Sequence, residues 1–129
     1  MLGAMYNGAE VSGYATVGND LKAERTRSGI EGLANDAEGS YKRSTPDGNF
    51  LHFDGQGNAT LNVPKDLLIQ VGGNLTINVG ENQTINVSMN STETIGMNKT
   101  VGVGMVNMLN VGMDFMTNVI GKLTHYVKG

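Results

Sequence analysis

The 129-residue sequence has no cysteine, no tryptophan, two prolines and only 5% aromatic residues. Without cysteine no disulfide framework can form, so the chain does not need an oxidising compartment. The scarcity of aromatic side chains removes much of the bulk on which a compact core usually draws. No apolar run approaches the roughly 18 residues of a membrane helix, and the start MLGAMYNGAEVSG lacks the charged and apolar regions of a Sec signal.

Basic charge is also scarce. Nine Lys and Arg stand against twelve Asp and Glu, which gives a net charge of −3. The longest basic run is Lys42-Arg43, so the sequence carries no electrostatic footprint for nucleic acid. Most charged residues lie before residue 67, which indicates that the two halves of the chain are built differently.

The second half is a repeat of eight residues, an octad. A column of β-branched residues recurs every eight positions, glycine often follows it, and methionine stands two positions after it in four octads. The column is Val63, Val71, Val79, Val87, Ile95, Val103, Val111, Val119 and Val127; the glycines are Gly72, Gly80, Gly96, Gly104 and Gly112; the methionines are Met89, Met97, Met105 and Met113. Such a short period argues against paired helices, so the octad itself is the structural unit.

Within an octad the apolar residues alternate with polar ones, as in Ile77-Asn78-Val79. Period two predicts one short strand per octad. We expect the Asn-x-Thr that follows, for example Asn74 to Thr76, to supply the corner, because these side chains bond to their own backbone.

One strand per octad cannot enclose a core by itself, which predicts an assembly of three chains around a common axis. The expected fold class is all-β: a homotrimeric triple-stranded β-helix, preceded by a short β-rich collar. The column and the four methionines are the predicted trimer core, where burial contributes about 1.5–3 kcal/mol per large side chain.

The run NLTINVGENQTINVSMNSTETIGMNKTVGVGM resembles the needle of VgrG spike proteins of type VI secretion systems, which is similar to the central spike of contractile phage tails. The opening LGAMYNG resembles the last strand of the family's OB-like domain, and Arg25-Thr26-Arg27-Ser28-Gly29 resembles the turn that precedes the needle. The resemblance divides the chain into the end of the OB-like domain (1–8), a collar (9–62) and the needle (63–129).

The resemblance implies a structural function without catalysis: a needle that pierces a target envelope and carries a tip protein and effectors. The implied partners are two further copies of the chain, a PAAR-type tip protein that docks at His125, Tyr126 and Val127, effectors, and transiently the target membrane. The family's base, which sits on the Hcp tube, is absent, so we expect a carboxy-terminal fragment or an engineered needle. The spike would assemble in the bacterial cytoplasm and leave through the injection machine. The alternative is a trimeric β-helical stalk of a phage tail fibre, tailspike or adhesin.

We expect no cofactor and no metal. His125 is the only needle histidine and is expected to lie at the surface. Glu93 stands where other octads have Ile77, Ile85, Val101 or Leu109. At the axis three copies of Glu93 would need a cation, protonation or water, whereas at a corner Glu93 would be solvated, which we favour.

Turn chemistry also marks the collar. Asp47-Gly48 and Asp54-Gly55 predict turns that flank strands at 49–53 and 60–63.

Overall fold

The computed structural model describes residues 21–129, which fall into two compact units, one ending at Asn78 and one spanning Val79–Gly129. The strand predicted over residues 1–8 lies outside this range. Residues 21–129 contain strands and irregular segments but no helix, and hence no helix that could span a membrane. The predicted all-β class is therefore confirmed.

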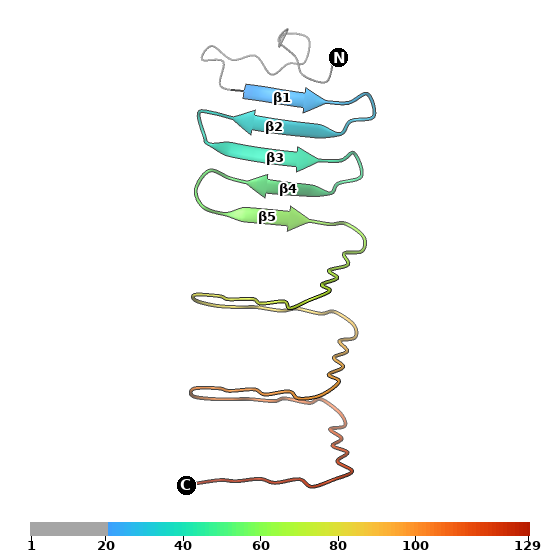
Figure 1. The fold of residues 1–129 in the computed structure, drawn as a ribbon, viewed down its shortest axis with the longest axis vertical. Coiled ribbons are helices and arrows are strands. Elements are labelled where there is room, and N and C mark those ends of the chain that lie inside the picture. The colour runs from blue at the N-terminus through green and yellow to red at the C-terminus, as the bar shows by residue number, and fades with distance from the viewer. Residues whose placement is uncertain (1–20) are drawn as a thin grey trace. The chain divides into compact units, whose positions relative to one another are not determined.

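The first unit contains a five-stranded antiparallel sheet in which each strand pairs with the next along the chain (Figure 1). The strands are β1 (Leu21–Arg25), β2 (Glu31–Asn35), β3 (Ser40–Ser44), β4 (Phe50–Phe53) and β5 (Ala59–Asn62). The last two match the strands predicted at 49–53 and 60–63 to within one residue at each end. β5 ends immediately before Val63, the first member of the β-branched column.

The β1–β2 and β3–β4 turns lie at the same end of the sheet and have the same hydrogen-bond pattern. In the β1–β2 turn the N–H of Thr26 donates to the Ile30 carbonyl at 2.9 Å, and that of Gly29 donates to the Thr26 carbonyl at 3.1 Å. Thr45 and Gly48 make the same pair of bonds in the β3–β4 turn. Gly29 and Gly48 both have φ of +99°, a conformation that costs glycine little and other residues much. The turns expected at Ser28-Gly29 and Asp47-Gly48 are thus present.

The chain's two prolines lie against these turn glycines. A Cβ on Gly29 would come within 3.1 Å of Cγ of Pro46, and one on Gly48 within 3.0 Å of Cγ of Pro64. The Asn62 side-chain amide also donates to the Gly48 carbonyl at 2.9 Å. Because Pro64 begins the octad array, these contacts fix where the array leaves the sheet.

The β4–β5 turn is organised by one carboxylate. Asp54 accepts hydrogen bonds from the Asn58 side chain at 2.8 Å and from the backbone N–H groups of Gln56 at 2.7 Å and Asn58 at 3.1 Å. These bonds, the Asn58 amide first, lower the pKa of Asp54 because they favour its charged form. Asn35 organises the β2–β3 turn in a similar way: its side-chain oxygen accepts hydrogen bonds from the N–H groups of Ala37 and Glu38.

Very little of the sheet is buried within one chain. Among residues 21–129 only Ala23 is a buried hydrophobic residue, at 8% exposure. One face of the sheet carries the cross-strand pair Leu51 and Leu61 together with Phe53, which are 41%, 58% and 46% exposed. A sheet normally needs an apolar face packed against something else for independent stability. This sheet therefore requires a partner surface.

Beyond β5 the chain contains no strand, helix or hydrogen-bonded turn (Figure 1). Instead the backbone bends sharply at pairs of residues and runs openly between them. The bends lie at 64–65, 72–73, 80–81, 88–89, 96–97, 104–105, 112–113 and 120–121, which is a spacing of eight throughout.

Two neighbouring glycines of the β4–β5 turn make a matched test of the sheet. Gly55 and Gly57 have φ of +82° and +92°, but a Cβ on Gly55 would overlap the Glu38 carbonyl, whereas nothing lies within 4 Å of one on Gly57. Gly57→Ala should destabilise by about 1–2 kcal/mol through backbone strain alone. Gly55→Ala should cost clearly more, because it also pushes the β2–β3 turn away.

Denaturant unfolding at one fixed protein concentration, followed by circular dichroism, measures both variants. Equal losses for the two would show that the β2–β3 and β4–β5 turns do not pack against one another.

Candidate functional site

The bends place the repeat positions of the octad in space. Each bend consists of the two residues that follow a column residue, so the repeat glycines occupy the first bend position and the four methionines the second. Ser88 and Ile120 take the glycine position in two octads. The expectation that Asn-x-Thr forms the corner is wrong: Asn74 follows the bend at 72–73, and Thr76 lies in the open segment.

Exposure within one chain differs systematically between octad positions. Column residues from Val71 to Val119 are 44–53% exposed, the least of the large apolar residues in each octad. The four bend methionines, by contrast, are 87–94% exposed. Residues of both groups remain predicted core positions of the trimer, but within a single chain only the column is partly covered.

The backbone of residues 63–129 makes no hydrogen bond to another backbone group. Ordering a residue costs about 1–2 kcal/mol of backbone conformational entropy, and this segment recovers none of it through internal pairing or full burial. An unpaired strand edge is a template for pairing with another chain. The octad array is therefore a surface suited to assembly with other chains.

At the repeat glycines, too, a single chain leaves space unfilled. None of Gly72, Gly80, Gly96, Gly104 and Gly112 has a positive φ, and a Cβ built on any of them would meet nothing within 4 Å. Neither backbone conformation nor packing in this chain requires glycine at the bend. We infer that another chain packs beside each bend, because glycine has no side chain and allows a close approach.

In an extended backbone alternate side chains point to opposite sides, so sequence parity assigns the open segments an odd-numbered and an even-numbered face. The odd face carries the column and residues such as Ile77, Ile85 and Leu109, while the even face of the first octads carries asparagine and threonine. Away from the bends, Glu93 and Lys99 are the only Asp, Glu, Lys or Arg residues on the odd face of 63–129.

These two charges contact each other. Nζ of Lys99 donates to Oε1 of Glu93 in an ion pair, the only one made within residues 63–129. The pair spans the bend at 96–97, and the two side chains are 53% and 59% exposed in one chain. Glu93 lies between two bends, so the expectation that it occupies a corner is wrong. Sequence reasoning missed Lys99, because neighbouring octads carry the polar residues Ser91 and Asn107 at its position.

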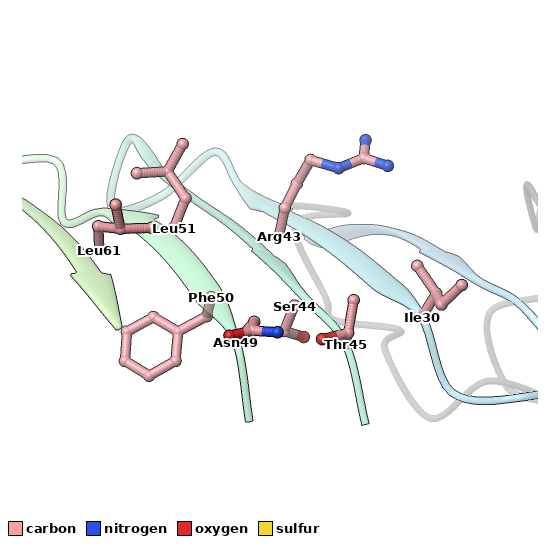
Figure 2. Close-up of a pocket in the computed structure, with 8 residues that line it drawn as sticks. All are labelled: Ile30, Arg43, Ser44, Thr45, Asn49, Phe50, Leu51 and Leu61. Atoms are coloured by element: carbon pink, nitrogen blue, oxygen red, sulfur yellow. The ribbon is translucent and has the colours of Figure 1, made fainter. Parts of the chain in front are cut away.

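The sheet adds a second uncovered surface. Figure 2 shows Leu51, Leu61 and Arg43 on one side of the sheet and Phe50 on the other, around an open groove that also borders Ile30. Arg43 reaches the Tyr41 hydroxyl at 3.2 Å and Glu24 at 3.9 Å on the same face. On the opposite face the Lys42 ammonium lies 4.4 Å from the centre of the Phe50 ring.

The remaining predicted positions lie at the end of the chain. Tyr126 and Val127 are 84% and 88% exposed, and His125 is also exposed. Val127 is thus far more exposed than the earlier column residues from Val71 to Val119. Within residues 21–129 no group of three or more His, Asp or Glu side chains is arranged to hold a metal ion.

These observations define a class of protein: an all-β structural chain that completes its hydrogen bonds and covers its apolar faces by assembling with copies of itself. Comparison with known families gives the same result. Residues 46–129 match the model of the bacteriophage T4 gp5 C-terminal trimerisation domain, and the chain belongs to this family. It is accordingly a homotrimeric, phage-spike-like structural protein. No curated protein matches the chain.

An isosteric exchange tests which face turns inward in the trimer. Val103→Thr replaces a methyl group of the column by a hydroxyl, whose burial without a partner should cost about 1–3 kcal/mol per chain. Thr100→Val makes the reverse change on the even face of the same segment and should stay within about 0.5 kcal/mol. Thermal unfolding with light scattering measures both. Loss of stability in Thr100→Val with Val103→Thr unchanged would mean that the even face is the inner one.

Proposed function

We propose that the chain is the puncturing needle of a type VI secretion spike of the VgrG kind. In this proposal residues 63–129 of three chains wind into a triple-stranded β-helix. The observation that carries it is the pattern of bends spaced by eight residues in a backbone without internal hydrogen bonds. Only strands from neighbouring chains, added at every octad, would satisfy such a backbone along its whole length.

The mechanics of this arrangement suit a needle. Every inter-strand bond would join different chains, so no strand could leave without breaking contacts to its neighbours. If stacked strands lie about 4.8 Å apart, each octad would advance the shaft by about that distance. Contraction of the sheath would drive the rod through the target envelope, and the function requires no catalytic residue.

The partners follow from the same proposal. On the N-terminal side of the needle a base would sit on the Hcp tube. Effectors would travel with the spike. The spike would assemble in the bacterial cytoplasm and be exported by the injection machine. A PAAR-type tip protein would cover His125, Tyr126 and Val127, whose exposure supports a docking surface at this end.

Deleting whole and half octads tests the needle directly. Removing residues 79–86 takes out one octad and keeps the bend spacing, so the trimer should form and melt within a few degrees of the wild type. Removing 79–82 preserves the odd and even faces but also removes the bend at 80–81, so the bends on either side of the deletion lie twelve residues apart instead of eight. Because inter-chain pairing is then interrupted, this trimer should melt clearly lower or fail to assemble, as size-exclusion chromatography with light scattering would show.

The same two deletions distinguish an injection needle from a passive stalk. In the bacterium that carries the gene, sheath-dependent killing of neighbouring cells should survive the whole-octad deletion and fail with the half-octad deletion. Killing that is unaffected by either deletion, or by removal of 63–129, would contradict the proposal and favour a stalk.

Tip docking has its own test. The trimer lacking residues 125–129 should lose capture of a PAAR-type protein encoded beside the gene, while Lys122→Ala, just before the removed segment, should retain it. Affinity pull-down from purified components measures both. Capture that persists without these residues would place the tip contact elsewhere.

A further inference from the structure

The octad array has a problem of register. Sliding one chain by eight residues places column residue on column residue and bend on bend, so the apolar contacts alone distinguish poorly between alignments. Register is weakly specified wherever a repeat looks the same after a shift. A long trimer of this kind needs at least one layer that is unlike the others.

Glu93 and Lys99 provide such a layer. They are the only Asp, Glu, Lys or Arg residues of the odd face away from the bends, and they pair with each other across the bend at 96–97. In neighbouring octads the position of Glu93 is held by Ile85 and Val101, and in an earlier octad the position of Lys99 is held by Leu75. A chain slipped by one octad would therefore set Glu93 against an apolar residue, Ile85 or Val101, and Lys99 against Ser91 or Asn107.

We propose that the three Glu93–Lys99 pairs form one internal ionic layer of the trimer, which fixes the register of the chains. The occupants of the surface are the two further copies of this chain. The inference rests on the proposed three-chain needle and deepens it.

The charge balance supports this assignment. Three copies of Glu93 alone would bring three like charges together, which would favour protonation or demand a cation. With Lys99 from each chain the layer holds three negative and three positive charges and neutralises itself. A polar group at a single core position can specify alignment at a cost in stability. The layer therefore needs no axial ion.

Single and paired substitutions separate an internal layer from a surface ion pair. Glu93→Ile and Lys99→Leu install the residues that other octads carry there, and each alone should lower the melting temperature of the trimer by roughly 10 °C, since the remaining charges are left unpaired. The double variant and the exchanged pair Glu93→Lys with Lys99→Glu should recover to within about 3 °C. Asp114→Asn, on the even face, is the control and should change little.

The salt dependence of the melting temperature gives an independent test. An exposed pair is worth little and is screened by salt, so both single variants would then melt within about 2 °C of the wild type and the difference would vanish at high salt. That result would overturn the proposal. A penalty that persists at 1 M NaCl supports an interior position.

Register is measured by a spin label. The chain has no cysteine, so Asn110→Cys gives one labelling site per chain on the even face beyond the layer. In the aligned trimer, electron–electron distance measurement should give one distance by three-fold symmetry. The double variant Glu93→Ile with Lys99→Leu should give additional distances from slipped chains, although its melting temperature is restored.

A single unchanged distance in the double variant would overturn the register role. Failure of the underlying needle is distinguishable from this result. If the wild-type mass by light scattering is not that of three 13.6 kDa chains, the proposed needle is contradicted, and so is the ionic layer that rests on it.

Discussion

The structure depends on one constraint: from Val63 onward the backbone has no hydrogen-bonding partner in its own chain. Entropy makes a regularly bent, unpaired segment too costly for one chain to hold, and half-exposed column residues do not offset that cost. Assembly with other chains would offset this cost, and the chain belongs to a family of trimerisation domains.

The sheet of 21–62 prepares this step, because it pairs its own strands and positions the first bend. Asn62 and Pro64 hold the start of the array against the turn at Gly48, so the array begins from a fixed point in each chain. Yet the sheet also leaves Leu51, Phe53 and Leu61 uncovered on one face. Leu61 has the same odd parity as Val63, which links the apolar face of β5 to the face that carries the column. Both parts of the chain thus expose apolar surface of the kind that copies of the chain can cover.

Much of this organisation was readable from the sequence. Asp-Gly and Ser-Gly steps located turns of the sheet because positive φ at glycine is a local requirement, and period two located β4 and β5. The corners of the octads were misplaced because Asn and Thr carry turn chemistry in general, as Asn35 does, whereas the structure bends one or two residues earlier. The ion pair was missed because its members are six residues apart across a bend, a separation that no simple strand or helix rule brings together. Only the bend positions reveal that Glu93 and Lys99 can meet.

A trimer built from repeated octads must meet two opposing requirements on its inner face, uniform burial and a defined alignment of the chains. Uniform apolar layers give each octad the same burial, which favours length, but uniformity also makes every slipped alignment nearly as favourable as the correct one. In the proposed trimer a single charged layer would resolve this at low cost, since Glu93 and Lys99 already pair within each chain. Its position matters as well: Glu93 lies three octads beyond the first bend held by the sheet, where the influence of that fixed point on alignment would be weaker than at the start of the array. The sheet would then set register at the base of the array, and the ionic layer would restore it further along the shaft.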